Sequence, residues 1–243
     1  MKNKSGDVVV NKYRIAELNV LMNPIFDTLK TRGESYLYDF EGKEDIVAIL
    51  SQQELEERSS QHSTLSIDDC EYLYTGADFY EKLLDFQGMF LHASAVAVDG
   101  KAYLFSAPCG VGKSTHTALW QDYFGKEKAI IINDDKPAIR FMDGNFYVFG
   151  TPFSGKTDNN TNIKVPLKAI CFLEQAKENT IRKMSAVEAL MQIFNQTIRP
   201  ADAEKMEQLI FLVDKLLKNI PVYKMGCNIS LDAVETSYTV MSK

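Results

Sequence analysis

Residues 107–115 read Ala107-Pro108-Cys109-Gly110-Val111-Gly112-Lys113-Ser114-Thr115. Their spacing is that of the phosphate-binding loop G-x-x-x-x-G-K-[ST], with Ala107 in place of the first glycine. An alanine fits that position if its φ angle is negative, because positive φ is costly for a residue with a Cβ atom. The apolar residues 103–105 before the loop predict a strand, and residues 114–123 after it predict a helix. A strand, a glycine loop and a helix in this order predict a nucleotide site.

We expect the whole loop, from Ala107 to Thr115, to take part in nucleotide binding. Gly110 and Gly112 let successive backbone N–H groups curl around phosphate oxygens, and the positive end of the following helix points to the same place. Lys113 is expected to reach the β- and γ-phosphate oxygens, and the Ser114 hydroxyl is placed to bind Mg²⁺. The predicted cofactors are therefore ATP and Mg²⁺.

Two adjacent aspartates, Asp134 and Asp135, follow the apolar strand predicted at 129–133. A carboxylate at the end of a strand soon after a phosphate-binding loop is where a P-loop protein holds Mg²⁺. We therefore expect Asp134 to serve the metal and Asp135 to accept a proton from an attacking hydroxyl or water. The alternative is a solvated turn, because Asp-Asp pairs are common in loops. Arg140, five residues further on, is another candidate contact for phosphate.

The composition argues against several classes of protein. The 243 residues carry 27 Lys and Arg against 33 Asp and Glu, a net charge of −6, which argues against binding to nucleic acid or an anionic membrane. The four scattered cysteines form no C-x-x-C pair, as expected for reduced thiols in the cytoplasm. No run approaches the roughly 20 apolar residues of a membrane helix, and the start of the chain lacks a secretory signal. We expect a cytoplasmic protein with no nucleic-acid or membrane partner, and the sequence leaves open whether it forms a homo-oligomer.

The rest of the chain predicts an α/β fold, as one P-loop kinase-like domain over residues 1–243. The part before about residue 85 is expected to be β-rich, and the nucleotide-binding core spans about 90–230. Predicted strands lie at 13–20, 36–40, 45–50, 91–98, 102–105, 129–133, 139–142, 146–149, 167–173 and 222–225. Predicted helices lie at 77–89, 114–123, 186–197 and 203–218. The dipeptides Asp99-Gly100 and Asp143-Gly144 predict hairpin turns.

A known family shares several of these segments. Leu91-His92-Ala93-Ser94, the short hairpin, the phosphate-binding loop and Ile131-Ile132-Asn133-Asp134-Asp135 resemble the catalytic domain of HPr kinase/phosphorylase. That family shares its fold with phosphoenolpyruvate carboxykinases, so the resemblance implies a mixed β core flanked by helices. The resemblance is clear over 90–140 and looser to about 230. The segment 150–156 resembles uncharacterised HPr-kinase-like proteins, some of which lie beside peptide-modifying genes.

Carried over position by position, the resemblance gives Lys113 and Ser114 to phosphate and Mg²⁺, and Asp134 to the metal. It makes Asp135 the catalytic base and places His92 beside the transferred phosphate. Lys156 lies in a loop rich in turn formers, and it is a candidate either to neutralise the transferred phosphate or to bind an acidic substrate, against the alternative of a surface lysine. The arginine-rich signature loop of HPr kinase has no match, and the N-terminal part does not resemble that family's own. HPr is therefore not carried over as a substrate.

Three functions fit the sequence. The first is an ATP- and Mg²⁺-dependent kinase that transfers the γ-phosphoryl group to a hydroxyl of an unknown peptide, protein or small molecule. The second is a non-catalytic nucleotide-binding accessory protein in sensing or peptide modification. The third is a carboxykinase-like lyase, which would need further metal ligands and an arginine for a carboxylate substrate. The intact Asp134-Asp135 pair favours the kinase.

Overall fold

The computed structural model describes residues 10–62 and 64–243. Residues 1–9, on which the prediction of no secretory signal partly rests, lie outside the described part. Within it, nine strands form one mixed sheet, in which β4, β8, β9, β10, β6, β5 and β7 lie in that order, while β12 pairs with β10 and β11. The strands are β4 (Gly88–Phe90), β5 (Ala93–Val98), β6 (Lys101–Ser106), β7 (Ile130–Asn133), β8 (Ala138–Met142), β9 (Asn145–Phe149), β10 (Lys164–Gln175), β11 (Thr180–Lys183) and β12 (Val222–Cys227).

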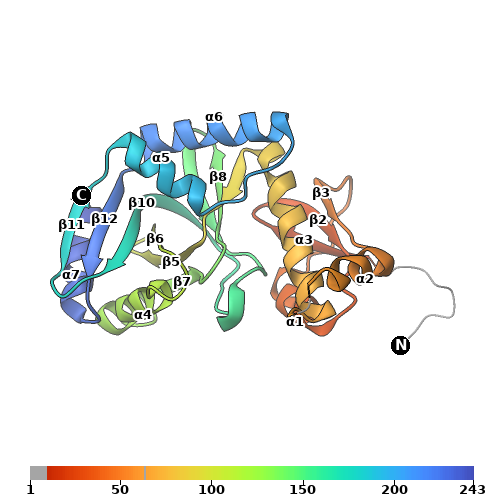
Figure 1. The fold of residues 1–243 in the computed structure, drawn as a ribbon, viewed down its shortest axis with the longest axis horizontal. Coiled ribbons are helices and arrows are strands. Elements are labelled where there is room, and N and C mark those ends of the chain that lie inside the picture. Colours follow the sequence, from red (N-terminus) through yellow and green to blue (C-terminus); the bar gives the residue numbers. More distant parts are fainter. Residues whose placement is uncertain (1–9, 63) are drawn as a thin grey trace.

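Strand β10 joins the two halves of this sheet. Its first residues pair antiparallel with β9, and its later residues pair parallel with β6 on one side and with β12 on the other. The strand is long enough, at 12 residues, to belong to both halves. The sheet therefore curls along β10, as Figure 1 shows.

Helices cover both faces of the sheet (Figure 1). Helices α4 (Lys113–Phe124) and α7 (Leu231–Met241) pack on one face, and α5 (Ala186–Asn195) and α6 (Ala203–Asn219) pack on the other. Because side chains alternate along a strand, Val96 and Val98 of β5 join the core under α4 and α7, while Ala95 and Ala97 join the core under α5 and α6. The prediction of an α/β fold with a mixed β core flanked by helices is confirmed.

Both predicted hairpin turns are present. Asp99 and Gly100 have φ angles of 51° and 69°, and they join the antiparallel strands β5 and β6. Asp143 and Gly144, with φ angles of 50° and 83°, join β8 and β9 in the same way. Positive φ at both central residues matches the twist of two-residue hairpins, which is why these dipeptides were informative.

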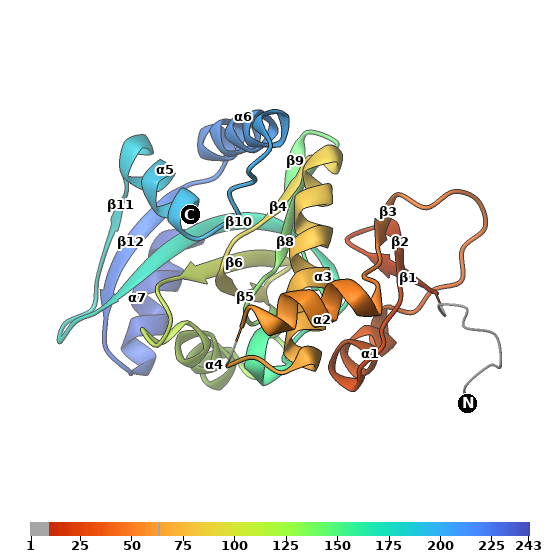
Figure 2. The ribbon, with the colours of Figure 1, turned by 45° about the vertical axis from the view of Figure 1, so that its right-hand side comes forward.

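The N-terminal part holds a separate three-stranded sheet and, beside it, three α-helices (Figure 2). These are β1 (Asn11–Ile15), β2 (Leu18–Met22), α1 (Asp27–Gly33), β3 (Ile46–Ala48), α2 (Gln52–Ser60) and α3 (Ile67–Leu83). Figure 2 shows α3 between this small sheet and the main sheet. Arg140 of β8, which is buried, ties the two together by donating hydrogen bonds to the backbone oxygens of Ala16 and Phe86.

Several elements of this part differ from the prediction. The part before residue 85 was expected to be β-rich, but its three short strands hold fewer residues than its three α-helices. The stretch 13–20 is a hairpin rather than one strand, because Ala16 and Glu17 adopt positive φ angles of 52° and 61°. Residues 36–40 form no strand, since Tyr36 ends a 3-10 turn and Leu37 makes a single bridge to Tyr13. The helix expected at 77–89 lies at 67–83.

Capping explains that shift of α3. The Ser66 side chain accepts the N–H of Asp69, and the Asp69 carboxylate accepts the N–H of Ser66 in return, which closes a capping box. The helix ends before Gln87, which adopts a left-handed φ of 53° and leads into β4. No helix among the described residues is long and apolar enough to cross a membrane.

Candidate functional site

The predicted site residues come together at one edge of the main sheet. Ala93, at the start of β5, pairs with Ser106 at the end of β6, and Ala95 pairs with Asn133 at the end of β7. The segment before β5 and the loops after β6 and β7 therefore meet at this edge. These segments carry His92, the phosphate-binding loop and the two aspartates.

The phosphate-binding loop has the backbone that the motif requires. Gly110 and Gly112 have positive φ angles of 82° and 117°, whereas Ala107 is not among the described residues with positive φ. Gly112 is the N-cap residue of α4, so no side chain occupies the N–H groups at the start of this helix. The first N–H groups of α4, including those of Ser114 and Thr115, have no partner within the helix, and such a terminus favours an anion.

Lys113 lies folded back against this loop. Its Nζ donates a hydrogen bond of 3.0 Å to the backbone oxygen of Ala107, and only 8% of the residue is exposed. Burial lowers the pKa of Lys113, against the opposing effect of nearby Asp135, Cys109 and Asp134. Because the Nζ has one neutral partner in a buried position, it is well placed to gain from a phosphate oxygen.

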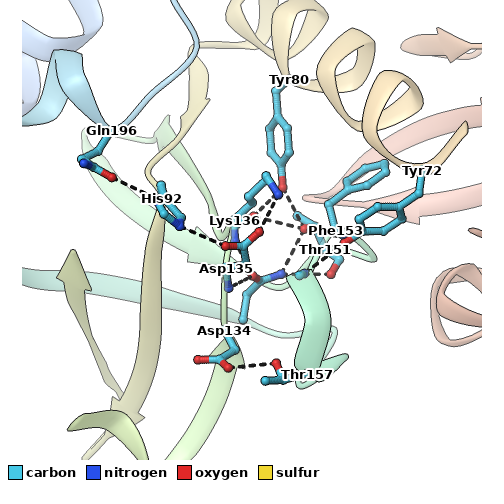
Figure 3. Close-up of polar contacts among 12 residues, drawn as sticks. Tyr72, Tyr80, His92, Asp134, Asp135, Lys136, Thr151, Phe153, Thr157 and Gln196 are labelled. Carbon is cyan, nitrogen blue, oxygen red and sulfur yellow. Dashed lines mark hydrogen bonds and ion pairs between the residues drawn. The ribbon is translucent and has the colours of Figure 1, made fainter. Parts of the chain in front are cut away.

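Asp134 is held at both carboxylate oxygens. Ser94 of β5 donates a hydrogen bond of 2.6 Å to Oδ1. Thr157 donates one of 2.8 Å to Oδ2 (Figure 3). The Ser94 hydroxyl also lies 2.7 Å from that of Thr117 in α4. This chain of contacts links Asp134 to the helix that begins at the phosphate-binding loop. Asp134 as a whole is 7% exposed and lines the same cleft as Ser114.

Asp135 lies between two basic side chains. Its Oδ1 is 3.2 Å from Nε2 of His92, and its Oδ2 is 2.5 Å from Nζ of Lys136. Nδ1 of His92 is in turn 2.8 Å from Oε1 of Gln196, so the imidazole is held at both nitrogens (Figure 3). Burial alone would raise the pKa of Asp135, but the hydrogen bonds and charges of His92 and Lys136 outweigh it and lower the pKa to about 2.

Asn133 shapes the turn that carries both aspartates. Its Oδ1 accepts the backbone N–H groups of Asp135, at 3.0 Å, and Lys136, at 2.8 Å. Its Nδ2 donates to the backbone and hydroxyl oxygens of Thr151. An asparagine that bonds to the backbone two residues ahead is a recurrent way to fix a tight turn.

A cleft of about 580 Å³ joins these groups. One wall consists of the phosphate-binding loop, His92 and the aspartates. The opposite wall comes from the N-terminal part, through Thr28 and Arg32 of α1 and Asp69 and Tyr72 of α3. The cleft therefore has a side that carries the phosphate-binding loop and a side built by α1 and α3.

The segment 154–157 extends over Asp135. A Cβ atom on Gly155, which has a φ angle of 73°, would lie 2.7 Å from the Cβ of Asp135, so only glycine fits both the space and the conformation. The segment is fastened by Tyr72, whose hydroxyl accepts the Gly155 N–H, and by Arg32, which donates to the Gly155 oxygen. Lys156, in the same segment, is exposed at the cleft.

The structure thus brings the predicted site residues to the cleft or its immediate border, except Arg140, which bonds with Ala16 and Phe86 and does not line the cleft. Sequence reasoning assigned no role to Lys136, Ser94, Arg32 or Tyr72, and for Thr157 it offered only the lining of a substrate entrance or a solvated loop. For Lys136 and Ser94 the only signal was their place beside Asp135 and His92. Arg32 and Tyr72 lie far from the motifs in sequence, and no local pattern marks them.

The lowered pKa of Asp135 predicts a pH-dependent contribution to stability. An aspartate whose pKa falls from 3.8 to about 2 on folding stabilises the protein above pH 4, and this contribution is lost as the pH falls towards 2. Such a shift corresponds to roughly 2 kcal/mol. The difference in unfolding free energy between the parent and Asp135→Asn should therefore shrink by about that amount from pH 5 to pH 2, measured by urea unfolding. An equal difference at both pH values would show that folding does not favour the charged carboxylate.

A divalent cation fits the donor set at the cleft. Among residues 10–62 and 64–243, no three His, Cys, Asp or Glu side chains form a group that could enclose a metal ion. Mg²⁺ does not need such a cage, because it keeps several waters and is bound by one or two protein oxygens plus phosphate. The Asp134 carboxylate and the Ser114 hydroxyl supply hard oxygens of that kind on the same cleft.

One family model and a number of solved structures are similar to this chain. The family described as SynChlorMet cassette protein ScmC matches residues 61–236, which include the phosphate-binding loop and the aspartates. No curated protein matches the chain. One similar solved structure is the Hpr(Ser) kinase/phosphatase from Coxiella burnetii. It is 12% identical, the match covers 63% of this chain and 92% of that one, and the TM-score is 0.34.

Proposed function

The chain belongs to the family of SynChlorMet cassette protein ScmC, and we propose that it is a phosphotransferase. Its donor would be ATP with Mg²⁺, and its acceptor the hydroxyl of a peptide, protein or small molecule. The observation that carries the proposal is one cleft with the phosphate-binding loop and Lys113 on one side, and with the charged Asp135 beside them. Loop, metal-binding carboxylate and a second carboxylate are the recurring parts of enzymes that transfer phosphoryl groups.

The phosphates would lie along the loop. The free N–H groups at the start of α4 and the Nζ of Lys113 would donate to the β- and γ-phosphate oxygens. Asp134 and Ser114 would hold Mg²⁺, which neutralises phosphate charge when it is bound. Ser94 and Thr157 keep the Asp134 carboxylate oriented for that role.

Asp135 would orient the acceptor. With a pKa of about 2 it stays charged, so it would accept a hydrogen bond from the acceptor hydroxyl. The hydroxyl becomes acidic only as its oxygen forms the bond to phosphorus and the bond to the β-phosphate oxygen breaks, and Asp135 would then take the proton. Lys156 would contribute positive charge beside the transferred group, and a protonated His92 would add to it.

The pairing of Asp135 favours one other function. Both of its carboxylate oxygens already have a basic partner, His92 on Oδ1 and Lys136 on Oδ2. If these pairs persist when nucleotide binds, the protein would bind ATP without transferring the phosphoryl group. It would then be a nucleotide-binding accessory protein.

ATP binding and hydrolysis with Mg²⁺ test the proposal, with water as the acceptor. Asp134→Asn removes the charge of a metal ligand, so the gain in ATP affinity that Mg²⁺ provides should fall about tenfold or more, measured by calorimetric titration with and without Mg²⁺. Asp122→Asn makes the same change on the exposed side of α4 and should leave that gain intact. A parent protein that shows neither ATP binding nor hydrolysis would refute the phosphotransferase.

A further inference from the structure

A smaller cavity of about 160 Å³ lies beside Lys136, the neighbour of Asp135 in the sequence. It shares Tyr72, Leu73 and Lys136 with the main cleft, so the two are neighbours. The shared Lys136 is the residue whose Nζ contacts Asp135. Figure 3 shows the rings of Tyr72, Tyr80 and Phe153 gathered on the Lys136 side of Asp135, away from His92. Nothing in the proposed transfer from ATP uses this side pocket.

The surface that the side pocket presents to a ligand is mainly apolar. Its hydroxyl groups are engaged elsewhere, because the Tyr72 hydroxyl accepts the N–H of Gly155, and the Tyr80 hydroxyl bonds with Lys136 and Thr151. The ring of Tyr80 lies 4.7 Å from that of Phe90 and 5.6 Å from that of Phe153, between ring centroids. The half-buried side chains of Ala77 and Ile198 complete the lining. Such a lining favours an apolar group over a polar one.

Packing fixes one wall of the side pocket. A Cβ atom on Gly76 would lie 2.9 Å from Cδ1 of Phe153, so α3 approaches this ring as closely as only glycine permits. Phe153 is itself 1% exposed. The wall that Phe153 forms is therefore fixed, and an apolar cavity of roughly 150 Å³ is large enough to bind benzene.

A row of residues on α3 connects the side pocket with the outer cleft. Asp69, Tyr72 and Leu73 line the main cleft, and Gly76 and Ala77, one turn further, line the side pocket. Residues at these spacings lie on one face of a helix. A ligand that reaches from Asp135 into the side pocket would thus also lie along α3, which suits a chain longer than one residue.

We propose that the side pocket binds an apolar side chain of the phosphoryl acceptor. The acceptor is then a peptide in which an aliphatic or aromatic residue lies within two positions of the phosphorylated serine or threonine. This inference rests on the proposed phosphotransferase. The hydroxyl would contact Asp135 while the neighbouring side chain enters the pocket beside Lys136, so the pocket would select the peptide and Asp135 would act on it.

A library of peptides with one fixed serine and one varied neighbouring position tests the preference. Incubated with the protein, Mg²⁺ and ATP labelled on the γ-phosphate, peptides with Leu, Ile, Phe or Tyr at the varied position should be labelled at least tenfold faster than those with Asp, Lys or Gly. Equal labelling across the varied position would overturn the inference.

Ala77→Phe tests the place of recognition, because the larger ring would fill the side pocket. Labelling of the preferred peptide should fall roughly 10- to 100-fold in kcat/KM, while ATP hydrolysis without peptide stays within twofold of the parent. Ala203→Phe, exposed at the start of α6, is the matched control and should change neither rate. Ile198→Ala, which widens the pocket, serves if Ala77→Phe fails to fold, and it should shift the preference towards larger aromatic residues.

The outcomes separate this inference from the proposed function. Hydrolysis of ATP without labelling of any peptide would overturn the peptide acceptor and leave the phosphotransferase standing. Peptide labelling that Ala77→Phe leaves unchanged would overturn the role of the side pocket. Absence of both hydrolysis and labelling would remove the phosphotransferase itself, and this inference with it.

Discussion

Asp135→Asn is expected to lower Mg²⁺-dependent ATP hydrolysis by roughly 10²- to 10⁴-fold, which is the usual contribution of a general base. Asparagine keeps the size of the side chain but offers no site for the proton of the attacking water. ATP affinity should stay within a few-fold of the parent, because the phosphate contacts belong to Lys113 and the start of α4. Steady-state hydrolysis and calorimetric ATP binding, measured on the same preparations, check both parts.

The control for this variant must account for its ion pairs. Asp135→Asn also removes the contacts with His92 and Lys136, so a partly unfolded variant would lose activity for another reason. Circular dichroism and unchanged ATP binding would exclude that explanation, and Asp122→Asn supplies the same loss of charge at an exposed position. If Asp135→Asn hydrolyses ATP as fast as the parent, the accessory protein becomes the better description.

The elements that the sequence predicted well are those with local signals. Asp99-Gly100 and Asp143-Gly144 specify hairpin turns through their own backbone preferences, and the phosphate-binding loop carries its glycines at fixed spacing. The pairing of β5 with β7, which brings His92 to Asp135, was not predicted and is seen only in the structure. Local signals thus predicted the hairpins and the loop, but not the order of the strands that assembles the site.

The N-terminal part was harder to predict because its elements depend on distant contacts. Tyr36 to Phe40 alternate like a strand, yet Tyr36 is buried at the end of a 3-10 turn and bonds with Asn160, more than a hundred residues away. Arg32 and Tyr72 likewise reach the site only because α1 and α3 pack against the segment 154–157. No window of sequence contains both partners of such a contact.

Arg140 illustrates the opposite error. Arg140 follows the aspartates by five residues, so it was a reasonable candidate to contact phosphate. The chain turns after the aspartates, however, and Arg140 lies in the next strand, β8. β8 runs away from the site edge, and Arg140 instead bonds with Ala16 and Phe86 between the two sheets. Distance along the sequence is a poor guide once a strand leads away from the site.

Lys113→Met is expected to weaken ATP binding by roughly 10- to 150-fold, the equivalent of about 1.5–3 kcal/mol for a charge-assisted hydrogen bond. Methionine keeps most of the length and packing of the buried side chain but carries no charge. Inorganic tripolyphosphate should lose affinity by the same factor as ATP, because the lost contact is to phosphate and not to the nucleoside. Calorimetric titration of both ligands with Mg²⁺ measures this directly.

The melting temperature of Lys113→Met distinguishes the loss of a phosphate contact from damage to the fold. Burial lowers the pKa of Lys113, so the charged amine is costly to the free protein, and its replacement by an apolar side chain should leave the melting temperature unchanged or raise it. Lys126→Met, at an exposed position after α4, should alter neither binding nor melting. If Lys113→Met melts like the parent and still binds both ligands at full affinity, the loop at residues 107–115 is a structural turn and the nucleotide site lies elsewhere.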